Sequence, residues 1–264
     1  MWLATIAAAG AEFQIPESIP QGGTLRISVR DTSRPLTATL GGKTIRLFAQ
    51  TERSFLGLMP ILADQTPGPV TLVIYLGAET LHTATVTVED AHFPIQDIRT
   101  TSRMSALKPL PGEMERIRDF QQTVSETRYW IEPLRAPTPD CRNSPFGVQR
   151  YHNGKPTGGY HRGVDLRSPS RRPVKAIAGG VVKISKMYRL HGGTVGIDHG
   201  QGLVSIYIHM SRLSVKEGAR VRKGQTIGLV GSTGFATGPH LHWGLYANGL
   251  PVNPDQWIPA RACR

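Results

Sequence analysis

Short runs of alternating or β-branched apolar residues follow one another through the first third of the chain. The clearest are TLRISVR, KTIRLFA, VTLVIYL and TLHTATVTVE, at positions 24–30, 43–49, 70–76 and 80–89. Alternation with a period of two is typical of half-buried strands, and the GG, PGP and GAE between the runs indicate turns. Strands at this spacing predict an immunoglobulin-like β-sandwich in residues 1–95.

The pattern changes between residues 96 and 140. The segment PGEMERIRDFQQTVSETRYW has apolar residues near helical spacing, and Glu113 and Glu115 fall in its first turn, where carboxylates favour the helix dipole. The Pro-rich APTPDCRNSP follows and marks the approach to a second domain. We therefore predict a helical linker over residues 96–140.

Glycine and β-forming residues dominate the last part of the chain. The stretches VKAIAGGVVKISKM, GTVGIDHGQGLVSIYIHM, RVRKGQTIGLVG and HLHWGLYANG are typical of successive strands joined by tight turns. They predict an antiparallel sheet crossed by a groove in residues 141–264. The fold class expected for the whole chain is therefore mainly β.

Length, composition and charge narrow the classes of protein. The 264 residues suit two ordinary domains, and no apolar run is long enough for a transmembrane segment. The net charge of +12 comes from the part beyond residue 100, because the first 100 residues hold 7 basic and 9 acidic side chains. Such a surface favours an anionic polymer, unless it reflects only a general preference for arginine. No basic stripe carries interleaved aromatic residues, so we expect no nucleic acid partner.

The two cysteines, Cys141 and Cys263, belong to no CxxC or Cys/His metal pattern. A bridge between them would close a loop of about 120 residues and stabilise the fold by up to about 5 kcal/mol in the chain-entropy model. That bridge would suit an oxidising compartment outside the cytoplasm. Two unpaired thiols are the alternative, and the sequence leaves both open.

Four residues point to metal chemistry. His161 and Asp165 lie in GGYHRGVDLRSP, and His240 and His242 lie in GSTGFATGPHLHWGLYANG. Two imidazoles and a carboxylate can hold a tetrahedral metal and leave one position for water, as in catalytic zinc sites. Residues i and i+2 of a strand share a face, so both histidines of HLH should point into the groove while Leu241 packs behind them.

These motifs, in this order, resemble the lysostaphin and LytM type of zinc metallopeptidase, a family of peptidoglycan endopeptidases. The resemblance covers about residues 144–258. It begins with SPFGVQRYHNGKP and runs through YHRGVDL, VGIDHGQGLVSIYIHMSRL, VKEGARVRKGQTIGLVGSTGFATGPHLHW and VNPDQW. The family implies a LytM-type antiparallel sheet domain with its active site in a groove.

The resemblance also assigns roles to single residues. His161, Asp165 and His242 match the three ligands of one Zn²⁺ ion, and His209 and His240 match the pair of histidines that serves the reaction. For His209 the alternative is a buried structural histidine held by Tyr207 or by backbone. The division of acid and base roles between His209 and His240 is left open.

The implied function is zinc-dependent hydrolysis of the peptide cross-links of bacterial peptidoglycan, with stem peptides as partners and the bond from D-Ala to diaminopimelate favoured. Some relatives act as non-catalytic activators of other cell-wall hydrolases, which is the main alternative. A third possibility is an adhesion module fused to an idle β-domain. The N-terminal domain could serve targeting, orientation or inhibition.

The substrate implies a location in the periplasm or cell envelope. The opening MWLATIAAAGAEF has small residues like those of a cleavage region but lacks a positive start and full signal length. We expect an exported protein whose signal is truncated or removed, although the segment could also be a first strand.

Two further groups could contact the substrate in the groove. Tyr160, Trp243 and Tyr246 could line it, although aromatic residues near a sheet more often pack in the core. A cluster of four arginines could bind carboxylates of the substrate. Its members are Arg162, Arg167, Arg171 and Arg172.

Overall fold

The computed structural model describes residues 10–260 and confirms a mainly β fold. Two short α-helices accompany the strands in this range, α1 (Ser102–Ser105) and α2 (Glu113–Gln121), with a final 3-10 helix, η1 (Pro254–Trp257). No helix among these residues has the length and apolar character that crossing a membrane requires. The expectations for the opening segment and for a bridge to Cys263 fall outside the described residues.

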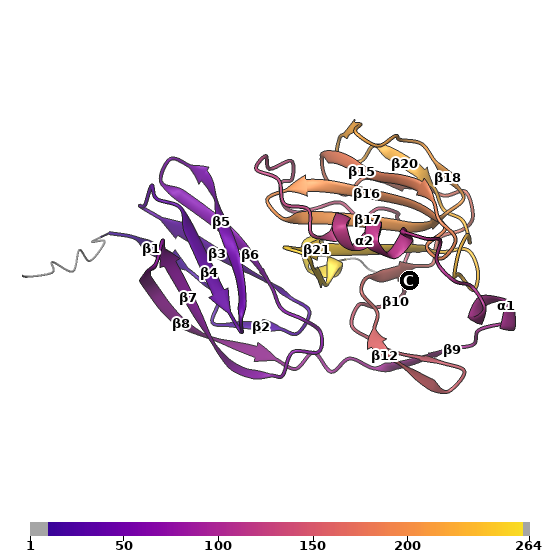
Figure 1. The fold of residues 1–264 in the computed structure, drawn as a ribbon, viewed down its shortest axis with the longest axis horizontal. Helices are drawn as coiled ribbons and strands as arrows, with labels where there is room; N and C mark the ends of the chain where they lie inside the picture. Colours follow the sequence, from indigo (N-terminus) through magenta and orange to yellow (C-terminus); the bar gives the residue numbers. More distant parts are fainter. Residues whose placement is uncertain (1–9, 261–264) are drawn as a thin grey trace, which may run out of the picture.

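The first eight strands form one curled sheet, drawn in indigo and purple in Figure 1. Its order is β1-β3-β6-β5-β4-β7-β8-β2, antiparallel except where β2 joins β8. Alternate apolar side chains, among them Leu25 and Leu72, turn inward and form a core of their own. An immunoglobulin-like topology stays a prediction. The strands are β1 (Glu12–Gln14), β2 (Ser18–Pro20), β3 (Thr24–Arg30), β4 (Leu36–Leu40), β5 (Lys43–Thr51), β6 (Ser54–Pro60), β7 (Gly68–Leu76) and β8 (Glu79–Glu89).

The second large sheet has the order β10-β13-β21-β17-β16-β15-β19, with β22 added to β21. All its pairs are antiparallel, and the glycine-rich turns expected from the sequence join them. The strands are β10 (Arg142–Ser144), β13 (Val164–Leu166), β15 (Gly180–Met187), β16 (Gly193–Gly200), β17 (Leu203–Met210), β19 (Arg220–Val221), β21 (Leu241–Ala247) and β22 (Leu250–Val252).

Two small three-stranded sheets flank this large one. One has the order β14-β20-β18, from β14 (Pro173–Lys175), β20 (Thr226–Leu229) and β18 (Arg212–Leu213). The other has the order β12-β11-β9, from β12 (Lys155–Tyr160), β11 (Gln149–His152) and β9 (Ile95–Ile98). The segment that follows the N-terminal sheet thus pairs, through β9, with the β11–β12 hairpin of the C-terminal part. β9 lies at an edge of this small sheet (Figure 1).

Alternation along the strands separates the two faces of the large sheet. Tyr207, Leu241 and Trp243 turn to one face and join the main core. Val204 turns to the other face, where α2 covers it with Ile117 and packs across β16 and β17 (Figure 1). His242 alternates with Tyr246 along β21 and therefore lies on this second face, as does Asp165 opposite it.

Candidate metal centre and groove

Three candidate ligands from two segments meet on one face of the sheet. Asp165 in β13 is directly opposite His242 in β21, so their side chains share a face while Leu241 packs behind in the core. His161 lies just before β13, and its backbone N–H donates to the carbonyl of Val148 at 2.9 Å. His242, the second histidine of HLH, thus points into the groove, as expected from the alternation in the sequence.

The donor atoms of these three residues are close together. His161 Nε2 lies 2.9 Å from His242 Nδ1, and Asp165 Oδ1 lies 3.1 Å from the first nitrogen and 2.9 Å from the second. Ligand atoms about 2.0–2.1 Å from a tetrahedral zinc ion are about 3.3 Å apart. The donor set therefore fits one small tetrahedral cation, and within residues 10–260 it is the one such cluster of histidine, cysteine and carboxylate side chains.

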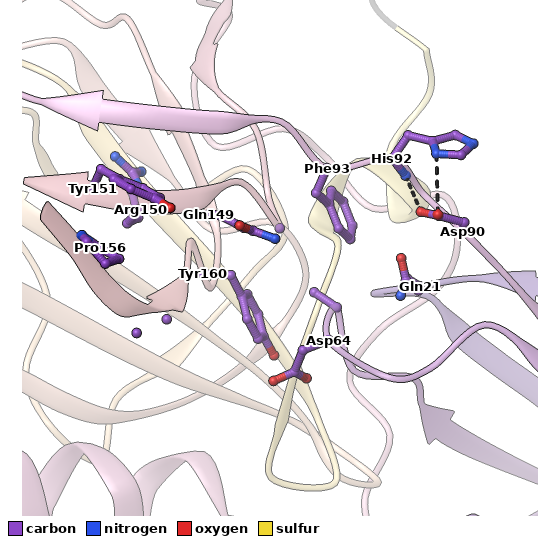
Figure 2. A pocket seen from close by; sticks show the side chains of 14 residues that line it. Gln21, Asp64, Asp90, His92, Phe93, Gln149, Arg150, Tyr151, Pro156 and Tyr160 are labelled. Carbon is purple, nitrogen blue, oxygen red and sulfur yellow. Dashed lines mark hydrogen bonds and ion pairs between the residues drawn. The ribbon is translucent and has the colours of Figure 1, made fainter. Parts of the chain in front are cut away.

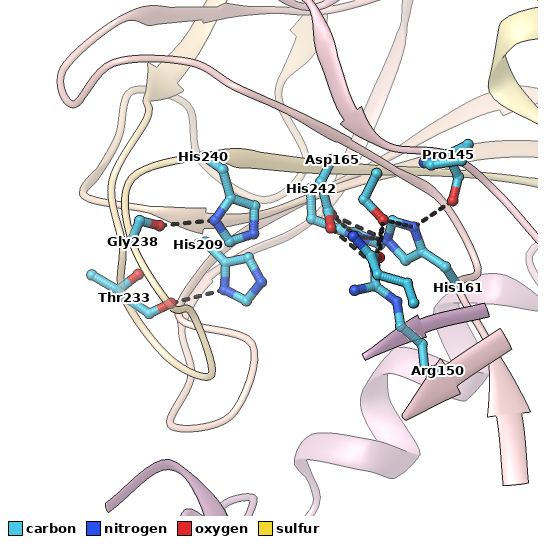
Figure 3. A network of polar contacts seen from close by, with 11 residues as sticks. Pro145, Arg150, His161, Asp165, His209, Thr233, Gly238, His240 and His242 are labelled. Atoms are coloured by element: carbon cyan, nitrogen blue, oxygen red, sulfur yellow. Dashed lines mark hydrogen bonds and ion pairs between the residues drawn. The ribbon is translucent and has the colours of Figure 1, made fainter. Parts of the chain in front are cut away.

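Neighbouring groups orient the ligands (Figure 3). The Nδ1–H of His161 donates to the carbonyl of Pro145 at 2.8 Å, which leaves the Nε2 lone pair facing the site. Asp165 Oδ2 accepts a hydrogen bond from Arg150 Nη2 at 3.0 Å, and Arg150 also donates to Ser144 Oγ at 2.9 Å. Such contacts fix ring and carboxylate orientation at metal sites. Ser144 and Arg150 lie in the stretch SPFGVQRYHNGKP that carries the family resemblance, but no role was assigned to either from the sequence.

The ionisation states suit metal binding. Burial raises the pKa of the Asp165 carboxyl, but hydrogen bonds and charge from His161 and His242 outweigh burial and hold that pKa well below its usual value. Burial lowers the pKa of His242 to about 4, although Asp165 opposes this shift. A carboxylate and a neutral imidazole are the forms that bind a metal ion.

A second pair of histidines lies beside this cluster. The rings of His209 and His240 are 4.8 Å apart between centroids, and the ring of His209 is 6.4 Å from that of His242. Each Nδ1–H donates to a backbone carbonyl at 2.8 Å, of Thr233 for His209 and of Gly238 for His240. Both Nε2 atoms therefore point away from these carbonyls, toward the ligand cluster (Figure 3).

A β-bulge aims the His209 side chain into the groove. In β17, Tyr207 belongs to the main core and Ile208 to the face under α2, so strict alternation would return residue 209 to the main core. Met210 takes that core place instead, because the register with β16 shifts here and His209 has a left-handed backbone with φ of 65°. Bulges and positive φ at non-glycine residues are common next to functional sites.

Burial also sets the protonation state of His209. It lowers the pKa of His209 to about 3, and charge on His240 and His242 acts in the same direction. His209 is therefore neutral at pH 7, with its proton on Nδ1. Its partner is a backbone carbonyl, while Tyr207 bonds Ser205 and Ile177 instead.

All five polar residues line one groove of about 490 Å³. One wall comes from β9 and the residues that follow it, together with β11. The other wall comes from the loop that carries Phe235 and Thr237. His152 of the first wall stacks on Phe235 of the second, with ring centroids 5.4 Å apart, and joins the walls at that point.

The aromatic residues suggested for the groove lie elsewhere. Trp243 and Tyr246 are buried in the two cores. Tyr160 lines a different hollow of about 590 Å³ between the N-terminal sheet and the β11–β12 hairpin, where it faces Asp64 (Figure 2). Burial raises the pKa of Tyr160, and Asp64 adds to that shift.

The arginine cluster suggested for substrate carboxylates also lies away from the groove. None of Arg162, Arg167, Arg171 and Arg172 lines it, and Arg172 instead pairs with Asp140. Arg99 and Arg150 line it instead. Arg99 could not be placed there from the sequence, since it reaches the groove only through the pairing of β9 with β11.

The curled antiparallel sheet with its His/Asp/His cluster defines the class, a β-domain with a candidate hydrolase metal site. Residues 159–254, about a third of the chain, match the family described as Peptidase family M23. This agrees with the lysostaphin and LytM resemblance seen in the sequence.

Two known proteins are similar to part of the chain. A DD-carboxypeptidase/endopeptidase, Mpg, of Neisseria meningitidis serogroup B is 45% identical over 112 residues, which are 42% of this chain and 26% of that protein. Peptidoglycan DD-endopeptidase ShyC of Vibrio cholerae serotype O1 is 40% identical over 122 residues, 46% of this chain and 28% of that protein. The chain thus matches about a quarter of the length of these relatives.

One solved structure is similar over almost the whole chain. The crystal structure of a candidate M23 peptidase from Pseudomonas aeruginosa superposes with a TM-score of 0.69 at 27% sequence identity. The match covers 92% of this chain and 95% of that one. The arrangement of the N-terminal sheet, the connecting segment and the C-terminal sheet therefore recurs in that structure.

Proposed function

We propose that this protein is a zinc-dependent endopeptidase that hydrolyses peptide cross-links of bacterial peptidoglycan, with the bond from D-Ala to diaminopimelate as the favoured target. One observation carries the proposal. Three metal-ligand atoms converge within 2.9–3.1 Å, beside a second pair of histidines whose Nε2 atoms face them. The M23 family match supports the choice of reaction and substrate, as do the relatives named as a DD-carboxypeptidase/endopeptidase and a peptidoglycan DD-endopeptidase.

The ligand set suits zinc. Two imidazole nitrogens and one carboxylate oxygen leave a fourth tetrahedral position open, which is the pattern of catalytic zinc sites. When bound, the ion supplies a Lewis acid that polarises a carbonyl and lowers the pKa of a water toward about 7. Among the described residues, Arg150 keeps Asp165 Oδ2 occupied, so Oδ1 is the oxygen presented to the ion.

The two remaining histidines would move protons in the reaction. Because Thr233 and Gly238 hold their Nδ1 protons, His209 and His240 present Nε2 lone pairs to the groove. Each can accept a proton from the attacking water, and the resulting imidazolium can donate it to the leaving amine or stabilise the oxyanion. Neutral His209 is already in the accepting form at pH 7.

The non-catalytic alternative is less favoured by the geometry. A regulator that had lost catalysis would not need five polar residues to line one groove with oriented ring nitrogens. The substrate also leads us to propose that the protein works in the periplasm or cell envelope, where peptidoglycan lies.

The test is digestion of purified peptidoglycan by the protein loaded with zinc, with and without a chelator. We expect release of soluble fragments that stops on chelation and returns with zinc. The variant His161→Ala should lose both bound metal and turnover. The variant His92→Ala, which changes an exposed histidine outside the groove, is the matched control and should keep both.

Mass analysis of products from a defined cross-linked muropeptide identifies the bond. The favoured bond is supported if the dimer yields two monomers whose summed mass exceeds that of the dimer by one water, and if one monomer carries a new D-Ala carboxylate. Digestion that ignores the chelator, or normal digestion by His161→Ala, would overturn the proposal. If the protein cleaves nothing but accelerates another wall hydrolase, the activator function replaces it.

A further inference from the structure

The edge strand β9 forms part of the groove wall. Four consecutive residues from Gln96 to Arg99 line the groove, although their side chains alternate between the two faces of the small sheet. Consecutive residues can all reach one cavity only when the edge of a strand, rather than one face, borders it. The order β12-β11-β9 leaves that edge without a neighbouring strand in residues 10–260.

Backbone groups on this edge face away from β11. The N–H of Gln149 donates to the carbonyl of Pro94, and that of Asn153 donates to the carbonyl of Ile98. Polar groups of successive residues point to opposite sides of a strand, so the even-numbered residues here pair with β11. The N–H and C=O of Asp97 consequently point outward, as in any edge strand open to another chain.

Specific contacts hold this wall in place. Asn153 accepts from the Thr100 N–H at 3.0 Å and donates to the Thr100 carbonyl and hydroxyl at 3.2 and 2.8 Å. Both Asp97 carboxylate oxygens accept from the Gly154 N–H at 3.0 Å. The tip of the β11–β12 hairpin therefore fixes the register of β9, and a partner would meet a preorganised edge.

The Arg99 side chain lies at the end of the β9 edge and is available to bind an anion. The Arg99 guanidinium lines the groove, is exposed, and forms no hydrogen bond or ion pair with another residue of the range 10–260. The other charged groups of the groove already have partners, since Asp97 bonds Gly154 and Arg150 bonds Asp165. Arg99 is thus available for a carboxylate, which it can bind in a bidentate manner.

We propose that the β9 edge is a docking strand for the substrate, which adds to it as an extended peptide with one of its free carboxylates on Arg99. This inference rests on the proposed function and names how that substrate binds. Strand addition draws its affinity from main-chain hydrogen bonds and its specificity from side-chain positions. Because Arg99 is the charged group of this edge without a partner among residues 10–260, it selects peptides with a free carboxylate, and we commit to stem peptides with free diaminopimelate carboxylates.

The first test changes one charge on each partner. Cleavage kinetics are measured for a cross-linked muropeptide dimer with free carboxylates and for the same dimer with the diaminopimelate carboxylate amidated. Arg99→Gln should raise KM for the free acid about tenfold, with little change in kcat, and leave KM for the amide unchanged. Arg99→Lys should recover part of the loss, because it keeps the charge but not the planar fork.

Arg103→Gln is the matched control, since Arg103 is an exposed arginine in the following helix that does not line the groove. It should leave KM unchanged for both dimers. Equal KM values for the free acid and the amide with wild-type protein would overturn the role of Arg99. An equal increase in KM for the free acid in Arg99→Gln and Arg103→Gln would also overturn it.

The second test probes the strand edge through binding alone. The zinc-loaded variant His240→Ala, which should not turn over, is titrated calorimetrically with synthetic stem peptides methylated at one backbone nitrogen at a time. Because alternate amides face a neighbouring strand, methylation should weaken binding about tenfold at one position and hardly at the next. A uniform effect, or none, would overturn strand addition. These outcomes are separable from failure of the proposed function, which is absence of cleavage by the wild-type protein.

Discussion

His209 owes its position to one backbone irregularity. Its motif, SIYIHM, is a regular run of β-formers, and alternation alone would have turned the imidazole to the same face as Tyr207. The bulge opposite β16 and the left-handed backbone at His209 reverse that orientation. A sequence pattern shows that a strand is present but does not mark where it carries an extra residue.

The variant His209→Ala tests whether this residue acts in the reaction. We expect the zinc content to stay at one ion per chain and kcat on a muropeptide dimer to fall by about 10²–10⁴, because a proton acceptor is lost while the ligands remain. Zinc is measured by atomic emission on dialysed protein, and folding by circular dichroism. Loss of metal or of the folded signal would instead make His209 a structural residue.

A different histidine, His199, ties stability to pH. It is fully buried, donates from Nδ1 to the Gly179 carbonyl at 2.6 Å, and lies 2.7 Å from Ser205 Oγ through Nε2. Burial lowers the pKa of His199 from 6.5 to about 4. Between these values the unfolded chain binds the proton more readily, so the contribution of neutral His199 is complete above pH 6.5 and falls as the pH drops toward 4.

The measurement is denaturant unfolding of metal-free protein at pH 7 and pH 5, for wild type and for His199→Gln. Wild type should lose about 2 kcal/mol more of its unfolding free energy than the variant does, since each unit of pKa shift is worth about 1.4 kcal/mol. Groups that titrate in both proteins cancel in this difference. Equal losses in the two proteins would show that His199 does not link pH to stability.

At the scale of elements, the alternation of apolar and polar residues predicted which segments are strands, but not which strands pair with one another. The alternation in HLHW correctly placed Leu241 in the core and His242 on the opposite face. The register that sets Asp165 opposite His242 was not readable, because it depends on how strands distant in sequence pair. For the same reason the sequence could not show that β9, which spans the start of the predicted helical linker, would form a wall of the groove.

A close approach between two elements gives an element-scale prediction at Gly163. A Cβ built there would lie 2.6 Å from the Trp243 carbonyl oxygen and 2.8 Å from the His242 ring. The backbone oxygen cannot move without shifting β21, so Gly163→Ala should displace the ligand histidine. We expect zinc affinity to fall by at least about tenfold, in the range found when the groups that orient ligands are altered.

Gly159→Ala is the matched control, because a Cβ at Gly159 meets nothing within 4 Å and its backbone is not left-handed. Competition with a chromophoric zinc chelator measures both variants against wild type. If Gly163→Ala binds zinc as tightly as Gly159→Ala does, the strand contact does not set the position of His242.

For the whole molecule, the two large sheets are joined by apolar and polar contacts. Leu58 of β6 packs in the main core of the C-terminal part, and its carbonyl accepts from Asn248 Nδ2 at 2.8 Å. Arg26 binds Glu132 through two nitrogens at 2.8 and 2.9 Å and stacks 4.3 Å from the Trp257 ring. Because Leu58 is part of a shared core, unfolding of the N-terminal sheet should expose apolar surface of the peptidase domain.

We therefore expect the N-terminal sheet to contribute to the stability of the C-terminal domain. Leu72 is buried in the N-terminal core alone, whereas three of the four tryptophans, Trp130, Trp243 and Trp257, belong to the C-terminal core. With Trp2 replaced by Phe in every protein compared, tryptophan fluorescence reports the unfolding of that core. Leu72→Ala should remove about 2–5 kcal/mol of stability through loss of burial and the cavity left behind. If the sheets unfold together, the tryptophan-detected midpoint in denaturant falls as the N-terminal sheet loses stability.

Thr71→Ala, an exposed change in the same strand, is the control and should leave that midpoint unchanged. A tryptophan transition that ignores Leu72→Ala, while circular dichroism reports an earlier separate step, would mean that the two sheets unfold independently despite the contact at Leu58.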